Sequence, residues 1–392
     1  MERDYVVIGG GIMGVCTAYH LASAGNSVLL LERRSVAPRP PISSSGDIAR
    51  IFRTAYGGRG HMTRLSLHSL EWWRRFEEEA GSQLFVPRSM VVFGAASARS
   101  SRHWREPEAA AWAAESFRTM NDEVVACELL SKKALLARYP QIAARESFDV
   151  ALIDASAGLL YASRAVLAIA HLAEASGLEI WENATVERVV RSGRYVQGLV
   201  VNGKLVSARR AVIFAAGAMN LTLIPELRSK VQISRQQIVH FTLPDQRHGI
   251  RELPIIIDLD ARKYLYALPD GTIAVADDEN RDKSKLVDPA RDIPPYADES
   301  FWPEATAFAS SHVPALSDLR RREGKSCVYS NTVSQEYLLY RADNAVVISA
   351  CSGHGFKNGP TVGLAAAELA MGRESHWYFD VFRYEHAQDY CL

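Results

Sequence analysis

The chain has 392 residues, of which 48% are hydrophobic and 23% are charged, a composition typical of a globular protein with room for two domains. Lys plus Arg and Asp plus Glu both number 45, so the formal net charge is zero, which argues against nucleic acid or an anionic membrane as the main partner. We expect no membrane span and no secretory signal. The five cysteines form no CxxC pair, so we expect no disulfide framework and no metal site, and a cytoplasmic location is the default.

The N-terminal segment has the pattern of a β-α-β unit. Residues 4–8 form a short apolar strand, and residues 13–24 carry apolar side chains at helical spacing. Residues 27–31 form a second apolar strand, which ends at Glu32. After a loop rich in proline and serine, a long helix is predicted for residues 61–80.

Further strands and helices follow through the rest of the chain. Strands are predicted at residues 84–87, 90–93, 178–181, 186–190, 211–215 and 345–349. Helices are predicted at residues 95–120, 165–175 and 361–371. Between residue 231 and about residue 275 the chain has the pattern of alternating antiparallel strands.

Buried apolar strands of the kind found in Rossmann-like domains therefore occur at the start, the middle and the end of the chain, with blocks of antiparallel strands between them. This pattern predicts an α/β (α+β) protein, in which a discontinuous Rossmann-like domain carries an antiparallel-sheet substrate domain. We assign residues 1–81, 150–225 and 315–392 to the dinucleotide-binding domain, and residues 82–149 and 226–314 to the substrate domain.

A glycine-rich loop, GGGIMG at residues 9–14, joins the first strand to the first helix. Gly9 allows a tight turn, Gly11 lets the backbone approach a pyrophosphate, and Gly14 lets the helix pack closely on the strand. Glu32 stands where a carboxylate accepts hydrogen bonds from ribose hydroxyls. The loop predicts a dinucleotide site but does not choose between FAD and NAD.

A second glycine-rich segment, SGHGFKNGPTVG at residues 352–363, follows a buried strand and opens a helix. Such a helix start aims backbone amides at an anionic ring edge, as a reduced flavin presents. The alternative is a C-terminal turn whose glycines serve packing alone.

These motifs together resemble those of the D-amino-acid-oxidase-like flavoproteins, in the branch of monomeric sarcosine oxidase and N-methyltryptophan oxidase. The resemblance covers essentially the whole chain. Besides the glycine loop with Glu32, its landmarks are RIFRTAYG at residues 50–57, AAG at 215–217, GKSCVY at 324–329 and SGHGFK at 352–357. The last two are the specific ones.

The resemblance implies FAD as cofactor, attached covalently at its 8-methyl carbon to Cys327. A thiolate favoured by cationic neighbours suits this chemistry, and Lys325 is close in sequence. A buried, inert cysteine is the alternative. The other cofactor contacts that the resemblance implies are Gly9, Gly11, Ile12, Met13, Gly14, Glu32, Arg33, Ser45, Arg50, Val186, Ala216, Gly217, Gly353, Gly355, Phe356 and Lys357.

The resemblance also implies a substrate site. Arg53 and Lys357 match a pair of cations that clamps the substrate carboxylate, and Arg50 matches a basic residue beside the flavin ring. Tyr266 matches an active-site tyrosine, although a core tyrosine fits the pattern almost as well. His354 is not assigned as a base.

Two departures from the family pattern bear on activity. Ile273 stands at about the position of a lysine that speeds the reaction of reduced flavin with oxygen, and Ser44 and Ser45 replace the family's histidines. We therefore expect slow reoxidation in air and a pocket that differs from a simple sarcosine pocket.

The expected activity is FAD-dependent oxidation of the carbon–nitrogen bond of a small, carboxylated, secondary or cyclic amine to an imine, by a monomer that uses O2 and releases H2O2. One alternative is a dehydrogenase or imino-acid desaturase of specialised metabolism with another acceptor. The other is a non-catalytic FAD-binding structural or sensor protein.

Overall fold

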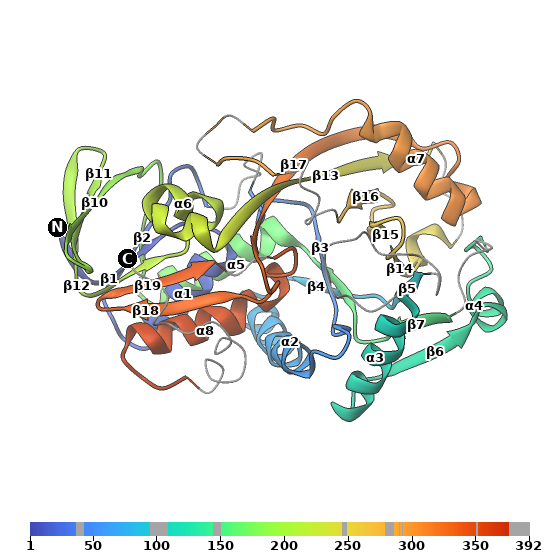
Figure 1. Ribbon diagram of the computed structural model, residues 1–392, viewed down its shortest axis with the longest axis horizontal. Helices are drawn as coiled ribbons and strands as arrows, with labels where there is room; N and C mark the ends of the chain where they lie inside the picture. Colours follow the sequence, from blue (N-terminus) through green and yellow to red (C-terminus); the bar gives the residue numbers. More distant parts are fainter. Residues whose placement is uncertain are drawn as a thin grey trace.

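The computed structural model describes residues 1–36, 43–94, 109–143, 150–244, 249–278, 286–289, 291, 293–349 and 352–375. Two large sheets dominate the molecule: the first lies at the end that holds the N-terminus, and the second lies toward the other end (Figure 1). The cavity described below lies between them.

The first sheet is of the Rossmann type, with parallel strands at its centre. β1 pairs in parallel with β2 on one side and β12 on the other, and β2 and β12 pair in parallel with β9 and β19. The β10–β11 hairpin extends the sheet beyond β12, and β18 pairs with β19. The strands are β1 (Glu2–Ile8), β2 (Val28–Leu31), β9 (Glu179–Trp181), β10 (Val186–Ser192), β11 (Tyr195–Val201), β12 (Lys204–Phe214), β18 (Leu338–Ala342) and β19 (Ala345–Ser349).

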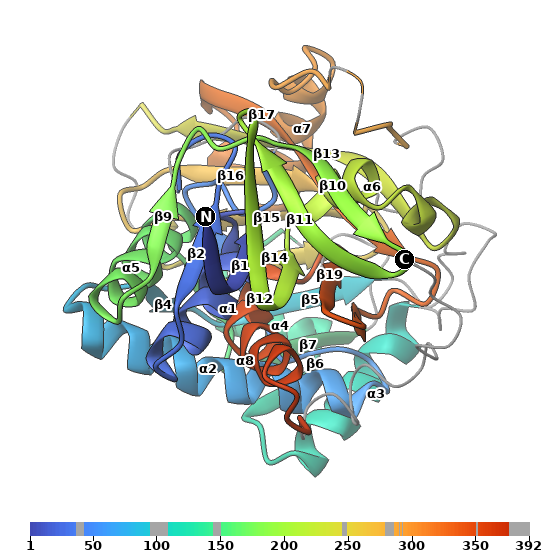
Figure 2. The same ribbon diagram turned by 90° about the vertical axis from the view of Figure 1, so that its left-hand side faces the viewer.

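Both faces of the sheet are buried at its central strands β1, β2 and β19, which explains why these strands read as continuous apolar runs. On one face Tyr5 and Val7 pack against helices α1, α2, α5 and α8, and α8 lies against α1 and α2 (Figure 2). On the other face Val6 and Ile8 pack against β11 and the short helix α6. The helices are α1 (Ile12–Ser23), α2 (Gly60–Ala80), α3 (Ala109–Asp122), α4 (Lys132–Arg138), α5 (Ala162–Ala175), α6 (Asn220–Leu223), α7 (Phe301–His312) and α8 (Gly359–Ala370).

The second sheet is mostly antiparallel and has the order β17-β13-β16-β15-β14-β5-β7-β6. Its two long strands, β13 and β17, run side by side from α6 to α7 (Figure 1). The strands are β5 (Met90–Gly94), β6 (Cys127–Ser131), β7 (Val150–Asp154), β13 (Val231–Thr242), β14 (Ile255–Asp258), β15 (Lys263–Ala267), β16 (Ile273–Asp277) and β17 (Arg320–Thr332).

A small third sheet connects the two halves, with β3 (Arg50–Phe52) and β4 (Phe85–Pro87) on either side of β8 (Gly158–Leu160). Short 3-10 helices complete the described fold: η1 (Gly217–Met219), η2 (Pro225–Ser229), η3 (Ile250–Glu252), η5 (Pro314–Leu316) and η6 (Phe356–Asn358).

The mixed α/β architecture agrees with the prediction, but two of the predicted domain boundaries cut through the second sheet. β7 and β17 fall in segments assigned to the dinucleotide-binding domain, and both hydrogen-bond within the second sheet instead. The reason is that the sequence of a single strand carries no mark of which sheet it joins. Of the helix predicted at 95–120, the structure describes α3 from Ala109, and residues 95–108 lie outside the described residues.

Candidate active site

A cavity of about 460 Å³ opens between the glycine loop after β1 and the second sheet. Most of the residues predicted to contact a cofactor or substrate line it: Gly9, Gly11, Ile12, Met13, Glu32, Arg33, Ser45, Arg50, Arg53, Val186, Ala216, Gly217, Gly353, Gly355, Phe356 and Lys357. Gly14, Tyr266 and Cys327 do not line it. Segments far apart in the sequence therefore meet at one site.

The glycine loop is shaped so that only glycine fits at two of its positions. Gly9 has φ +106°, and a Cβ atom there would lie 2.6 Å from the carbonyl oxygen of Ala215. A Cβ atom at Gly14 would lie 1.8 Å from the carbonyl oxygen of Gly9. The backbone thus passes closely in front of α1, whose N-terminus at Ile12 faces the cavity.

The carboxylate of Glu32 is held at the end of β2 by two backbone amides. Its Oε2 accepts from the Gly10 amide at 2.7 Å, and its Oε1 accepts from the Arg34 amide at 2.8 Å. Arg33 and Val186 line the same end of the cavity. These contacts place a fixed carboxylate beside the glycine loop, as a ribose-binding site requires.

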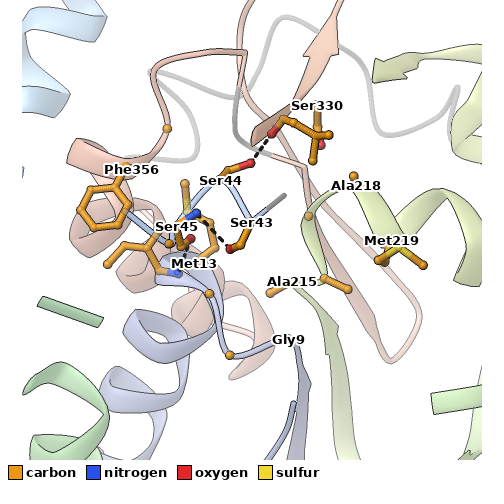
Figure 3. A pocket seen from close by; sticks show the side chains of 18 of the residues that line it. Gly9, Met13, Ser43, Ser44, Ser45, Ala215, Ala218, Met219, Ser330 and Phe356 are labelled. Atoms are coloured by element: carbon orange, nitrogen blue, oxygen red, sulfur yellow. Dashed lines mark hydrogen bonds between the residues drawn. The ribbon is translucent and has the colours of Figure 1, made fainter. Parts of the chain in front are cut away.

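Three serines lie between the glycine loop and β17 (Figure 3). Ser45 Oγ accepts from the Ile12 amide at 3.0 Å, and Ser44 Oγ donates to the carbonyl oxygen of Val328 on β17. In the same view Phe356 lies on one side of the serines, with Ala218 and Met219 on the other. The serine segment therefore connects the start of α1 to the second sheet.

Arg50, on β3, brings a buried positive charge to the cavity wall. Its Nη1 forms an ion pair with Asp47, while its Nη2 is buried and has no hydrogen-bond partner. Burial by itself lowers the pKa of Arg50, but the neighbouring Asp47 carboxylate outweighs this and holds it well above the ordinary value. A permanently charged group with an unused buried donor is suited to an anionic ligand.

Arg53 and Lys357 meet at the ring of Tyr56. Arg53 Cζ lies 4.4 Å from the ring centroid and Lys357 Nζ lies 5.7 Å from it. Lys357 is 4% exposed and donates to the carbonyl oxygen of His354 at 3.0 Å, while Arg53 donates to that of Ala55. Burial lowers the pKa of Lys357, and the Arg53 charge lowers it further. Two cations from distant parts of the chain thus share one part of the cavity wall.

The loop after Arg53 is fixed by a buried carboxylate. Asp154, at the end of β7, accepts from the Thr54 amide at 2.7 Å and the Thr54 hydroxyl at 3.0 Å. It also accepts from the Ser156 amide and hydroxyl, at 3.0 and 2.6 Å. This anchor sets where Arg53 leaves the backbone.

His354 is fully engaged in the structure and is not placed to act as a base. Its Nδ1 pairs with the Tyr337 hydroxyl and its Nε2 with the Gln335 carbonyl oxygen, both at 3.0 Å. Burial lowers the pKa of His354 well below its ordinary value, and the charge of Lys357 contributes in the same direction. The imidazole is therefore neutral and structural.

Cys327 lies on β17, where it is buried opposite Gln236 of β13. Its thiol does not itself line the cavity, although Val328 and Tyr329 do. It lies close enough to Arg50 to interact with it electrostatically. The thiol is thus buried on a strand whose next two residues line the cavity, within electrostatic range of a permanent cation.

Of the two tyrosines on β15, Tyr264 lines the cavity and Tyr266 does not. The ring of Tyr266 stacks on Tyr264 at 6.4 Å between centroids, and its hydroxyl donates to the carbonyl oxygen of Ala49 at 3.2 Å. Because residues two apart in a strand share a face, the two rings lie side by side on β15. The alternation puts Tyr264 on the same face as Tyr266, and the structure favours Tyr264 over Tyr266 for contact with a bound molecule.

The expectation about Ile273 needs correction. Ile273 and Val275 lie in the core beneath α7, whereas Ala274 and Ala276 belong to the cluster that contains Tyr266. A lysine at position 273 would therefore point away from the cavity. Adjacent residues of a strand point to opposite faces, so a position assigned only approximately from the sequence does not fix the face.

The sequence predictions also missed several lining residues. Thr185 directly precedes a strand and Asp278 directly follows one, and Tyr329 shares a face of β17 with Cys327, so sequence position could have indicated these three. Nothing in the sequence indicates that Ser43 and Ser330 line the cavity. Within the described parts of the chain, no group of three or more His, Cys, Asp or Glu side chains is arranged to hold a metal ion. None of the helices described is both long and apolar enough to cross a membrane.

The cavity fits FAD on two observations. The glycine loop can run close against Ala215 and the start of α1 only because Cβ atoms are absent at Gly9 and Gly14, and this leaves the N-terminus of α1 open to a pyrophosphate. Arg50, whose buried Nη2 has no partner, lines the same cavity. With the Glu32 carboxylate beside the loop, fold and site define a dinucleotide-dependent oxidoreductase.

The comparisons agree and name the family. The model of the family described as "DAO: FAD dependent oxidoreductase" matches residues 4–369, so the chain belongs to this family. It is 26% identical to the monomeric sarcosine oxidase of Bacillus sp. (strain B-0618), over 95% of this chain and 93% of that protein. It is 29% identical to the peroxisomal sarcosine oxidase of Mus musculus (94% and 92%) and 25% identical to the N-methyl-L-tryptophan oxidase of Salmonella typhi (98% and 98%).

Two solved structures support the fold. NikD, "an unusual amino acid oxidase essential for nikkomycin biosynthesis", superposes with a TM-score of 0.79 at 19% identity, covering 97% of this chain and 96% of that chain. The L-proline dehydrogenase from P. horikoshii superposes with a TM-score of 0.79 at 20% identity, with the same coverage. The protein is thus an FAD-dependent oxidoreductase.

Proposed function

We propose that this enzyme oxidises the carbon–nitrogen bond of a small amine that bears a carboxylate, giving an imine. The observation that carries the proposal is the pair of cations, Arg53 and Lys357, at one part of the cavity wall. Two charge-assisted contacts fix both the position and the tilt of a carboxylate, and with them the carbon to which it is attached. The names of the sarcosine and N-methyl-L-tryptophan oxidases that the chain resembles fit this substrate class.

The protein's own part in the reaction is placement and charge. Arg53 and Lys357 hold the carboxylate, Asp154 and Tyr56 keep Arg53 in place, and the apolar side chain of Phe356 and the ring of Tyr264 bound the space for the amine. FAD, when bound, supplies the acceptor for the hydride that leaves the carbon next to nitrogen. Arg50, which lines the cavity and has an unpartnered buried Nη2, would stabilise negative charge that develops on the cofactor.

Several finer features belong to the same proposal. We infer that FAD is attached to Cys327, that the enzyme acts as a monomer in the cytoplasm, and that O2 is the acceptor, with H2O2 as product. A dehydrogenase or desaturase with another acceptor is the alternative within the fold, and the peroxide yield per imine formed separates the two. A non-catalytic FAD-binding role would leave the flavin oxidised with every amine.

The experiment that tests the proposal is an anaerobic flavin-reduction screen with matched substrates. Each secondary or cyclic amino acid is compared with its amide, which keeps the amine but lacks the carboxylate charge. The wild-type enzyme should reduce its flavin quickly with the acid and poorly with the amide. A charge-assisted hydrogen bond contributes about 1.5–3 kcal/mol, so Arg53→Met and Lys357→Met should each weaken binding of the acid by roughly tenfold to over a hundredfold.

Arg59→Met is the matched control. Arg59 also lies over the Tyr56 ring, at 5.6 Å, but pairs with Glu336 and does not line the cavity. Arg59→Met should bind the acid as the wild type does. All three variants should retain FAD. If the Arg53 and Lys357 variants turn over a carboxylated amine as the wild type does, the substrate has no carboxylate at this site and the proposal shrinks to oxidation of a plain amine.

A further inference from the structure

Lys325 lies on the face of the second sheet that carries Cys327. The two residues are two apart on β17, so their side chains share a face. Lys325 pairs with Ile238 of β13, which lies opposite Ala276 of β16, and Ile238 and Ala276 pack in the cluster that contains Tyr266. The ammonium group of Lys325 therefore belongs to the wall behind the cavity and not to the outer surface.

Lys325 and Arg50 share one carboxylate. Lys325 Nζ lies 2.7 Å from Asp47 Oδ1 and donates to the carbonyl oxygen of Gly46 at 3.0 Å, while Arg50 pairs with the other oxygen of Asp47. The Asp47 side chain is 0% exposed. Burial by itself raises the pKa of Asp47, but the two cations outweigh it and lower that pKa, so the carboxylate is ionised.

The third group against Asp47 adds no compensating charge. His240 is 0% exposed, its Nε2 lies 3.6 Å from Asp47 Oδ1, and neither ring nitrogen makes a hydrogen bond. Burial lowers the pKa of His240, which keeps the imidazole neutral. Glu323, the next carboxylate along β17, is partly exposed and influences Lys325 less than Asp47 and Arg50 do.

Two cations and one carboxylate leave this cluster with a buried excess of one positive charge. A buried excess of positive charge is unfavourable unless an anion neutralises it. Arg50 offers the point of contact, because it lines the cavity and its buried Nη2 has no partner. The geometry thus calls for an anionic group on the cavity side of the cluster.

We propose that Lys325, held by Asp47, supplies the charge that with Arg50 stabilises the negatively charged reduced form of the cofactor ring. This rests on the proposed placement of the ring beside Cys327. Lys325 acts through space and through the Asp47 pair, without touching the substrate. It thereby sets how readily the bound flavin takes up two electrons.

The test measures the two-electron midpoint potential of the purified flavoprotein by equilibration with reference dyes, which requires no substrate. An opposite charge close by shifts such an equilibrium by about tenfold or more, so Lys325→Met should lower the potential by about 30 mV. Lys325→Arg keeps the charge and should retain the wild-type potential. Arg321→Met is the matched control, since Arg321 lies on the same strand in an exposed ion pair with Glu299.

Removing the Asp47 carboxylate should shift the midpoint potential in the opposite direction. Asp47→Asn should raise the potential, and the double variant Lys325→Met/Asp47→Asn, which restores the net charge, should return close to the wild type. Unchanged potentials in Lys325→Met and Asp47→Asn would overturn the inference and leave Lys325 as an anchor for residues 46–47. If Lys325→Met fails to retain FAD, the potential of Asp47→Asn alone tests the inference. A potential in Asp47→Asn that is unchanged or lowered would then contradict the charge argument.

The outcome is separable from the attachment at Cys327. Flavin that is released by acid but has a potential sensitive to Lys325 would refute the attachment and keep this inference. Flavin that stays attached in acid, with a potential that does not change in Lys325→Met, would support the attachment and refute this inference.

Discussion

Arg53 lies over the ring of Tyr56, with its guanidinium carbon 4.4 Å from the ring centroid. Lys357 approaches the same ring to 5.7 Å, and the ring itself is 1% exposed. Burial by itself raises the pKa of Tyr56, but the charges of Lys357 and Arg53 outweigh it and lower that pKa. One aromatic ring therefore holds two like charges close together before any carboxylate arrives.

The first prediction is that Tyr56 positions the clamp. Tyr56→Leu removes both the ring and the hydroxyl, and a buried cation–π contact is worth roughly 1–2 kcal/mol, so the KM for carboxylated amines should rise about five- to thirtyfold with a smaller change in kcat. Tyr56→Phe keeps the ring and should recover most of the loss. Steady-state kinetics on the acid and its amide provide the measurement. An equal loss with both substrates would assign Tyr56 a purely structural role.

The second prediction concerns alkaline pH. Lys357 attracts a carboxylate only while it is protonated, and its pKa is lowered from 10.5 by burial and by Arg53. The Kd of a simple carboxylate ligand without an amine should therefore be constant at low pH and rise as the pH passes through this lowered pKa, below 10.5. Titration by flavin absorbance measures it.

Two variants assign that inflection. Lys357→Arg carries a charge that does not titrate in this range, so the rise should disappear. Tyr56→Phe removes the other titrating group of the pair and should keep the rise. An affinity in the wild type that is independent of pH up to 10.5 would contradict the role of Lys357.

The third prediction is a covalent flavin. Cys327 is buried beside Arg50, on the face of β17 that it shares with Lys325. Acid-denatured wild-type protein should stay yellow and show the added mass of one FAD, whereas Cys327→Ala should release its flavin. Cys16→Ala, at a buried thiol in α1, serves as the control and should stay yellow. Complete release from the wild type would refute the attachment.

The fourth prediction concerns the anchor beneath the clamp. Asp154→Ala leaves the buried amide of Thr54 and the half-buried donors of Ser156 without this acceptor, which should destabilise the protein by about 2 kcal/mol. Urea unfolding measures the loss. Because Arg53 is next to Thr54, the KM for carboxylated amines should rise as well. An unchanged KM in folded variant protein would show that Arg53 is placed by other contacts.

The fifth prediction follows from the corrected face of β16. Ile273→Lys puts a charge into the apolar core beneath α7 and should destabilise the protein by several kcal/mol without speeding the reaction of reduced flavin with oxygen. Ile273→Val, the size control, should cost only about 0.5–1.5 kcal/mol. Thermal unfolding and stopped-flow mixing with oxygen measure the two effects. Faster reoxidation in a stable Ile273→Lys protein would mean that residue 273 reaches the cavity after all.

The sequence predicts those parts of the site whose chemistry is local. Gly9 and Gly14 were predictable because a turn and a close helix–strand contact require glycine, and Glu32 because it ends the second strand of the same unit. The structure brings Arg53 and Lys357 to one cavity wall, as the resemblance implied.

What depends on strand register and sheet membership was not predictable. The Lys325–Asp47 pair joins residues far apart in sequence. Tyr264 and Tyr266 share one face of β15, and only the position of the cavity along the strand makes Tyr264 the residue that lines it. Likewise, the sequence of β17 does not show which sheet the strand joins, and only its hydrogen bonds to β13 place it in the second. Periodicity identifies a face but not the neighbour that covers it.

The membership of β17 in the second sheet has a mechanical consequence. FAD held by the glycine loop after β1 and bonded to Cys327 on β17 would be a cross-link between the two sheets, in the way that a disulfide ties two segments. The cross-link would reduce the conformational freedom of the unfolded chain. In the holoprotein with covalently attached FAD, the two halves would therefore unfold in a single thermal transition. In Cys327→Ala the halves would be free to melt apart.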